Sequence, residues 1–260
     1  AGNTPYYYRI SAYNPGGTSG NSGSKNPTTT DPAGTVTATS ATLVTETSFK
    51  SNWNAYGGAT GYKLDVSTVS NFSSFVPGYN DLDVNNVLNY SVNTNLAGGT
   101  NYYYRIKSYN IGGTIATSGI IDVLTIPAAP AAIAAASIGE TSFTANWNFT
   151  AGSTGYYIDV ATDAGFTTFV TGFYNKYVNN VTTYSVTGLS AGTQYFYQVR
   201  GKNGSGISGN SGTTSVYTIP KEPNTLAPST IQSTAFDANW SSSAGATTYY
   251  NNVISLGGST

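Results

Sequence analysis

The chain of 260 residues contains no cysteine, no methionine and no histidine. Cysteine and histidine are among the side chains that most often act as nucleophiles, general bases or metal ligands. Charged residues make up only 8% of the chain, against about 25% in an ordinary soluble domain. We therefore expect no enzyme within this chain, with no catalytic residue, no metal site and no cofactor.

The ten basic and eleven acidic residues nearly cancel, so the formal net charge is −1. Such a chain has no strong electrostatic field to gather nucleic acid or anionic lipid, and we expect no nucleic-acid partner. The longest apolar run, residues 128–136, is rich in alanine and interrupted by Pro130. It is too short to cross a bilayer, so the sequence predicts no membrane span. Without a start methionine or a signal peptide, the chain is interpreted as a processed or excised piece.

Hydrophobic residues are 39% of the chain, which is enough to fill the interiors of its domains. The surface must then be built mainly from Ser, Thr, Asn, Gly and Tyr. Such a surface is typical of extracellular proteins. The absence of disulfides fits domains that bury an adequate core unaided. We therefore expect an extracellular or cell-surface location.

The chain repeats itself. Trp53, Trp147 and Trp240 each end a similar strand pattern, at spacings of 94 (53 to 147) and 93 (147 to 240) residues. A second landmark in residues 96–106 matches residues 189–199, and the chain opens inside a further copy. Repetition of this length predicts tandem domains. The expected parts are the C-terminal part of a domain, two complete domains and the N-terminal part of another, in residues 1–30, 31–127, 128–220 and 221–260.

Within a repeat, apolar and polar residues alternate. Phe143, Ala145 and Trp147 alternate with polar neighbours, and the same period recurs in residues 156–160 and 195–200. This is the period of a strand with one buried face. Short strands separated by clusters of Gly, Asn and Ser predict an all-β domain with a sandwich architecture. Proline follows the last strand of each complete repeat, in residues 125–127 and 218–220, and residues 30–32 are a looser version of the same junction.

The order of these landmarks resembles the fibronectin type III domain. In the third copy they are Trp147, Gly155-Tyr156, Leu189, Gly192-Thr193, Tyr195, Tyr197 and Val199, followed by Asn203, Gly206 and Ser208. The resemblance implies tandem immunoglobulin-like β-sandwiches with seven strands in two sheets. It implies core positions for Trp53, Trp147, Trp240, Tyr62 and Tyr156, and tyrosine corners at Tyr102 and Tyr195. The inserts at residues 72–75 and 166–169 resemble versions of the domain in secreted bacterial surface proteins.

Two interpretations of the incomplete ends stay open. The chain is a piece of a longer repeat array, or the tail of one chain completes the head of the next by strand complementation. Against complementation, the two ends together still lack the counterpart of residues 165–188. Asn251 also occupies the inward position held by Ile158 in the complete repeat, so we expect the last strand to differ from its counterparts.

The candidate chemical groups each have a structural alternative. Asp65 and Asp159 are equivalent and are expected on an outward face, in cross-strand ion pairs with Arg105 and Lys107 or with Arg200 rather than in catalysis. The pair Asp81 and Asp83 lacks a glycine-spaced calcium loop. Outward aromatic residues could stack on sugar rings, but packing on a neighbouring domain or on cross-strand partners is favoured. These residues are Tyr7, Tyr103 and Phe196.

The leading functional hypothesis is a structural segment of a secreted filament, stalk or adhesin, because low charge lets such chains lie side by side. Its expected partners are neighbouring repeats or other copies of the chain. The alternative is a spacer or carbohydrate-binding region of a secreted polysaccharide-degrading enzyme, which would add a glycan as partner.

Overall fold

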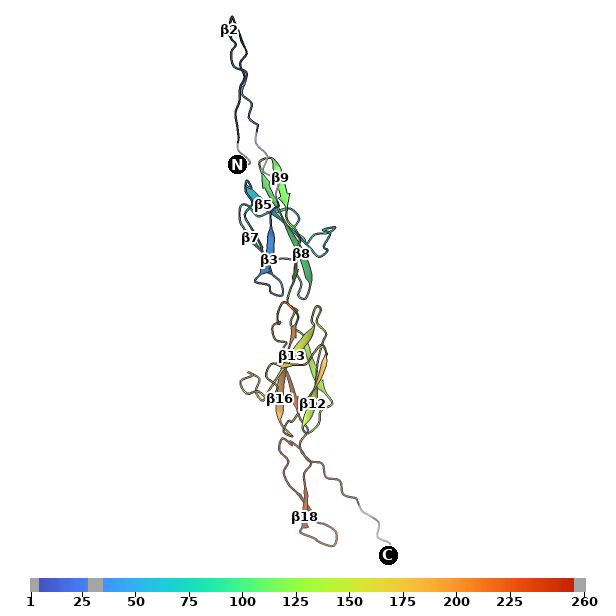
Figure 1. Ribbon diagram of the computed structural model, residues 1–260. Coiled ribbons are helices and arrows are strands. Elements are labelled where there is room, and N and C mark those ends of the chain that lie inside the picture. Colours follow the sequence, from blue (N-terminus) through green and yellow to red (C-terminus); the bar gives the residue numbers. More distant parts are fainter. Residues whose placement is uncertain (1–4, 28–34, 255–260) are drawn as a thin grey trace. The chain divides into compact units, whose positions relative to one another are not determined.

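The computed structural model describes residues 5–27 and 35–254, which fall into two compact units. One unit lies within residues 1–128 with 204–206, and the other within residues 129–203 with 207–260. Across the described residues every regular element is a β-strand, and every pair of neighbouring strands is antiparallel (Figure 1). The prediction of an all-β fold is confirmed. The predicted junction at residues 30–32 lies outside the described residues.

The first unit contains a sandwich of two sheets. One sheet has three strands in the order β3-β4-β7, which are Ala38–Thr42, Phe49–Trp53 and Asn89–Val92. The other has the order β10-β8-β5-β6, with β9 also paired to β8. Its strands are β5 (Gly61–Ser67), β6 (Leu82–Asp83), β8 (Asn101–Asn110), β9 (Gly113–Thr117) and β10 (Ile121–Leu124).

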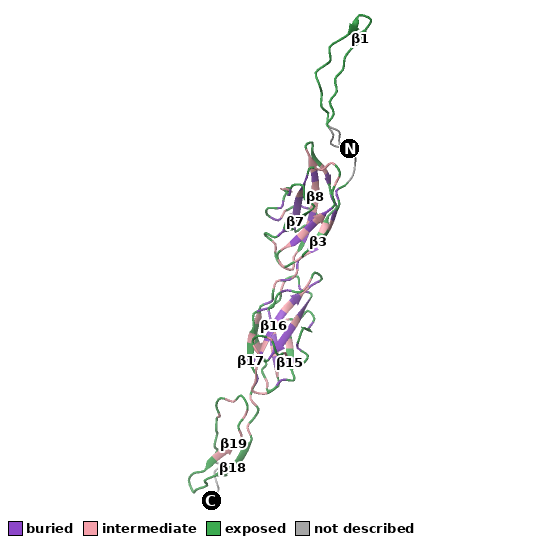
Figure 2. Cartoon of the chain, turned by 90° about the vertical axis from the view of Figure 1, so that its left-hand side faces the viewer, coloured by how far each residue is buried: buried purple, intermediate pink, exposed green. Residues whose placement is uncertain are grey.

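The core of this sandwich follows from the two-residue period of its strands. Buried and partly exposed residues alternate along β4 and β8, so each strand presents one apolar face. One cluster joins Phe49 and Trp53 of the first sheet to Tyr62, Leu64 and Ile106 of the second. The buried strands of both units stand out in purple in Figure 2. Because the cluster draws on both sheets, burial of its side chains holds the two layers together.

The second unit repeats this architecture. Its sheets have the orders β11-β12-β15 and β14-β13-β16-β17. The strands are β11 (Ala132–Ala136), β12 (Ser142–Trp147), β13 (Gly155–Ala161), β14 (Lys176–Tyr177), β15 (Thr183–Thr187), β16 (Gln194–Lys202) and β17 (Thr214–Tyr217). Even the irregularities recur, since the β3–β4 and β11–β12 pairs both shift register, after Thr39 and after Ile133.

Each end of the described chain is a hairpin. Strands β1 (Tyr13–Asn14) and β2 (Gly17–Thr18) pair in a segment whose residues are all exposed. Strands β18 (Thr225–Ser229) and β19 (Asp237–Trp240) pair near the other end. The expected third strand of this copy is not formed. Residues 246–254 contain no strand, and Asn251 is exposed. The prediction that this strand differs from its counterparts is thereby confirmed.

Candidate functional site

The tryptophans of the two sandwiches lie in their cores. Trp53 is 3% exposed and packs against Tyr62, with ring centroids 5.8 Å apart. Trp147 is 2% exposed and packs in the same way on Tyr156, at 5.6 Å. Both indole Nε1 atoms are buried without a hydrogen-bond partner. These rings therefore contribute through packing area alone.

Trp240 differs from the core position expected for it. It keeps its aromatic neighbour, with the Tyr249 ring centroid at 5.7 Å, but 39% of its surface is exposed. The prediction of a core position is wrong for this residue in the chain as it stands. The physical reason is that β19 pairs with β18 alone, and no second sheet covers that hairpin among the described residues.

Tyrosine hydroxyl groups tie down loops at equivalent places. The hydroxyl of Tyr102 accepts a hydrogen bond from the amide of Ala97 at 2.8 Å, and that of Tyr195 from the amide of Ser190 at 2.9 Å. This is the geometry of a tyrosine corner. Tyr62 and Tyr156 accept from amides six residues upstream, at 2.8 and 3.0 Å. All four rings are buried, so each hydroxyl satisfies a loop amide that packing has removed from water.

Two further tyrosines, not singled out from the sequence for their hydroxyl groups, link the sheets of each sandwich. Tyr104 of β8 is fully buried, and its hydroxyl donates to the carbonyl of Thr39 in β3. Tyr197 of β16 donates in the same way to the carbonyl of Ile133 in β11. Burial raises the pKa of both hydroxyls, although a backbone hydrogen bond partly opposes it. Both groups therefore stay protonated and act as donors.

A buried carboxylate forms the electrostatic centre of the first sandwich. Asp65 Oδ2 lies 2.7 Å from Arg105 Nε and 2.8 Å from Lys107 Nζ, while Oδ1 accepts from the amide of Asp81 at 2.7 Å. Lys107 Nζ also pairs with Asp81 Oδ1 at 2.6 Å. Burial alone would raise the pKa of Asp65, but hydrogen bonds from Lys107, the Asp81 amide and Arg105 outweigh it and lower that pKa. The carboxylate is ionised and fully occupied by its partners.

The second sandwich builds the equivalent centre with fewer charges. Asp159 accepts from Arg200 at 2.8 Å, from Gln198 at 3.2 Å and from the amide of Asn175 at 2.6 Å. The predicted cross-strand ion pairs are thus confirmed. Both carboxylates are nevertheless covered, since Asp65 is 0% and Asp159 3% exposed. Loops following β5 and β13 fold over the carboxylates and cover them, which strand periodicity could not indicate.

The acidic residues Asp81 and Asp83 are engaged in local contacts. Asp83 accepts from the hydroxyl of Tyr109 at 3.0 Å and from the amide of Asn85 at 2.8 Å. Asp81 is held by Lys107. In residues 5–27 and 35–254, no group of three acidic, histidine or cysteine side chains could hold a metal ion. No helix in the described part of the chain is long and apolar enough to cross a membrane.

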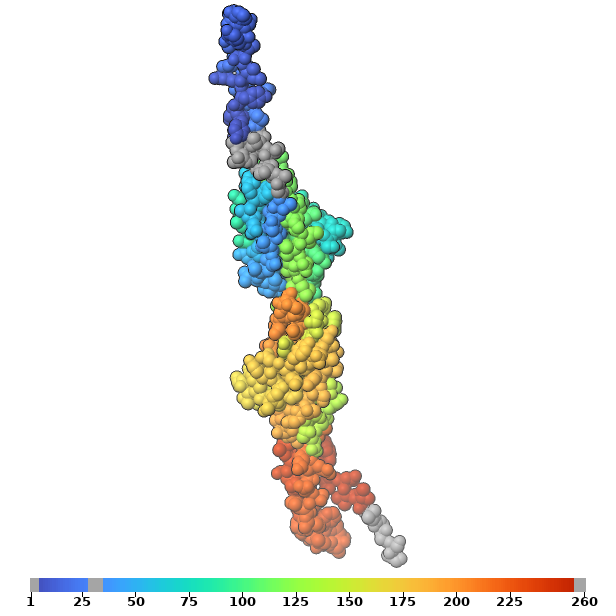
Figure 3. Space-filling model, in the orientation of Figure 1, coloured from blue at the N-terminus to red at the C-terminus, as the bar shows by residue number. Residues whose placement is uncertain are grey.

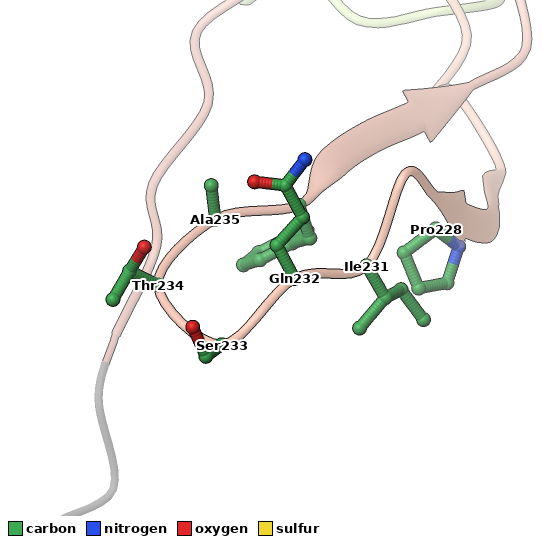
Figure 4. Close-up of a pocket in the computed structure, with 7 residues that line it drawn as sticks. Pro228, Ile231, Gln232, Ser233, Thr234 and Ala235 are labelled. Atoms are coloured by element: carbon green, nitrogen blue, oxygen red, sulfur yellow. The ribbon is translucent and has the colours of Figure 1, made fainter.

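A shallow pocket lies at the turn of the β18–β19 hairpin (Figure 4). Its lining runs from Pro228 and Ile231 through Gln232 and Ser233 to Phe236. None of the residues lining it carries an ionisable side chain. The pocket offers apolar surface and a few hydroxyl and amide groups, and its lining provides no general base that could activate those hydroxyls.

The outward aromatic residues expected as contacts belong to three different repeats. Tyr7 is 72% exposed in the first hairpin, whereas Tyr103 of β8 and Phe196 of β16 are half-buried. No sandwich therefore gathers them into one stripe. A denser aromatic cluster, not expected from the sequence, lies beside β13 and β14. Its residues are Tyr157, Phe169, Tyr174 and Tyr177.

Comparison with known proteins agrees with the fold. Residues 128–217 match the family model described as Fibronectin type III domain. A structure of chicken CNTN1 FN1-FN3 domains is 18% identical and covers 84% of this chain and 77% of that chain, with a TM-score of 0.35. A two fibronectin type-III domain segment from chicken tenascin is 17% identical and covers 70% and 99%, with a TM-score of 0.41. No curated protein matches the chain. The family match covers the second sandwich, and the fold class of tandem all-β sandwiches is as predicted.

Proposed function

We propose that this chain is a structural segment of an extracellular filament, stalk or adhesin of the cell surface, built from repeated β-sandwiches and without enzymatic activity of its own. The observation that carries the proposal is that the distinctive polar groups are used inside each repeat. The carboxylates of Asp65 and Asp159 are buried and paired, and the hydroxyls of Tyr104 and Tyr197 link the sheets.

The hairpin contacts support the same role, because they recur three times at one spacing. Ser22, Ser118 and Ser211 each accept a hydrogen bond at 2.9 Å from an amide twelve residues upstream. A catalytic or ligand-binding group would be needed once, whereas a group that closes a hairpin is needed in every repeat. The recurrence of these hydroxyls therefore favours a structural role over a chemical one.

The low charge of the chain supports self-association or contact with neighbouring repeats. With a net charge of −1 and only 8% charged residues, adjacent copies repel each other weakly. The exposed hairpins at both ends offer unpaired strand edges that another chain can extend.

Electron microscopy of the native protein that contains this chain tests the proposal, with gold-labelled antibodies raised against residues 35–217. The expected result is labelling of extended surface structures at intervals that match a repeat array. Labelling confined to the cell interior would contradict it. Labelling of a released protein that hydrolyses polysaccharide would favour the alternative function, a spacer or carbohydrate-binding region of a secreted enzyme.

A further inference from the structure

The second sandwich carries two pairs of aromatic rings on one side. Phe169 and Tyr174 lie with ring centroids 4.6 Å apart, and Tyr157 and Tyr177 at 5.4 Å. Tyr174 is 64% and Tyr177 44% exposed. The loop between β13 and β14, which carries Phe169 and Tyr174, stands out from the sandwich as a yellow ridge in Figure 3. The rings therefore present broad apolar surface to solvent, where hydrophobic burial would favour their coverage.

Two cations lie among these rings. Arg200 joins the pairs, because its Nη2 donates to the side chain of Asn175 and its guanidinium lies 5.9 Å from the Tyr157 ring centroid. Lys202 Nζ lies 5.6 Å from the Tyr177 ring centroid. Within the described residues Lys202 makes no ion pair, whereas Arg200 is paired with Asp159 and its unpartnered Nε is buried. Asp159, the acid at the centre of this region, is buried and already paired.

The first sandwich provides an internal comparison. Subtracting the repeat of 94 residues places Asn80 at the position of Tyr174, Lys63 at that of Tyr157 and Asp83 at that of Tyr177. The strand register agrees, since Lys63 pairs with Asp83 as Tyr157 pairs with Tyr177. A complete sandwich thus folds with polar residues at all three positions. The rings of Tyr157, Tyr174 and Tyr177 are consequently not a requirement of the fold, whereas Phe169 has an aromatic counterpart in Phe75.

We propose that this aromatic face, defined as Tyr157, Phe169, Tyr174 and Tyr177 with Arg200 and Lys202, binds an acidic polysaccharide. The apolar C–H faces of pyranose rings cover the exposed aromatic rings, as apolar ligand surface does in binding sites generally. The ammonium of Lys202 donates hydrogen bonds to the carboxylates of uronic acid residues. Because Arg200 is paired with Asp159, Lys202 leaves this face with an uncompensated positive charge, which favours an anionic ligand over a neutral one. The proposal is independent of the structural role proposed above.

Binding of the full chain to oligogalacturonate, measured by titration calorimetry at low salt, tests the proposal. The expected result is binding that weakens with added salt and is at least about tenfold tighter than binding to an uncharged glucan of equal length. Tyr174→Asn, which installs the residue of the first sandwich, is expected to weaken binding about tenfold through loss of stacking. Lys202→Gln is expected to weaken binding to oligogalacturonate and to reduce its salt dependence.

Phe149→Ser is the matched control, because Phe149 is a 65% exposed aromatic residue of the same repeat that lies outside the aromatic face. It should leave binding unchanged. Absence of binding to oligogalacturonate overturns the proposal, as does binding that survives Tyr174→Asn and Lys202→Gln together. Concentration-dependent self-association that is lost in Tyr174→Asn, without glycan binding, would instead assign the face to contacts between copies of the chain and would also overturn it.

Discussion

At the scale of single residues, each buried carboxylate connects its own strand to a neighbouring strand and to a loop. Asp65 receives two side-chain cations and one backbone amide, so it joins β5 to β8 and anchors the loop at Asp81. Its partners Arg105 and Lys107 keep 27% and 17% of their side-chain surface exposed. Water therefore screens part of the attraction, and the pair is worth less than a fully buried one.

We expect Asp65→Asn to lower the free energy of unfolding of the first sandwich by about 2 kcal/mol, because it leaves two cations with a weaker partner. Urea denaturation monitored by circular dichroism measures this. Glu140→Gln is the control, since Glu140 is exposed and its replacement should change stability by less than about 0.5 kcal/mol. If the Asp65→Asn variant is as stable as the parent chain, the charge of the carboxylate does not stabilise the sandwich, and the prediction is wrong.

The pH dependence of the same variant has a defined sign. The folded pKa of Asp65 is lowered, so its contribution is fully present above the unfolded value of about 3.9 and is lost as pH falls through the folded pKa. Burial would lower the pKa of Lys107, but its hydrogen bonds to the carboxylates of Asp65 and Asp81 outweigh burial and raise that pKa, so its contribution is lost as pH rises through the folded pKa. The melting temperature of Asp65→Asn should therefore fall less steeply in acid than that of the parent chain.

At the scale of elements, equivalent glycines of the two sandwiches are each covered by a tyrosine ring, and the two rings come from different strands. Gly61 and Gly155 begin β5 and β13. A Cβ on Gly61 would collide with Tyr109 of β8, and a Cβ on Gly155 would come within 2.5 Å of the Tyr177 hydroxyl of β14. The residue facing each tyrosine also changes, from Asp83 in the first sandwich to Lys202 in the second. The strand that supplies the ring varies, but the close packing on the glycine is kept.

Gly155→Ala should therefore destabilise the second sandwich by about 1–3 kcal/mol, because the Tyr177 ring must move away from the strand. Adding Tyr177→Ala should remove most of that cost, and urea denaturation of the two single variants and the double variant gives the coupling energy. Gly209→Ala serves as the control, since a Cβ there meets nothing within 4 Å. Additive effects of the two changes would contradict the contact.

At the scale of the whole molecule, burial divides the chain into cores and hairpins. Each unit has its own sandwich core, while residues 5–27 are exposed throughout. An isolated two-stranded hairpin is marginally stable in water. We therefore expect the β1–β2 and β18–β19 hairpins to open more readily than the two sandwiches.

Tryptophan fluorescence tests this division, because Trp53 and Trp147 are buried and Trp240 is 39% exposed. We expect acrylamide to quench Trp240 preferentially, and Trp240→Phe to remove most of the quenchable emission. Trp147→Phe is the comparison and should remove emission that acrylamide reaches poorly. If Trp240 is shielded in the dilute parent chain, its hairpin is covered after all. Shielding that develops only as protein concentration rises would favour completion by a second copy.

The sequence by itself determined the repeats, the all-β fold and the inward residues of both sandwiches. These depend on local periodicity, since alternate residues of a strand face the same way whatever the strand packs against. The core positions of Trp53, Tyr62, Trp147 and Tyr156 were identified in this way, whereas their ring contacts join strands of different sheets and depend on how the two sheets pack.

Only the tertiary structure decided which outward residues are covered. Asp65 and Asp159 alternate as surface residues do, yet loops fold over them and bury them. Within the aromatic face, Tyr177 lies on a strand of two residues and Phe169 and Tyr174 lie in a loop, and neither segment has a periodicity to read. Trp240 shows the converse, because its local pattern is that of a core residue and its exposure depends on a second sheet that its hairpin does not meet. Whether a residue is finally buried also depends on what packs over its strand, and the alternation along that strand does not encode this.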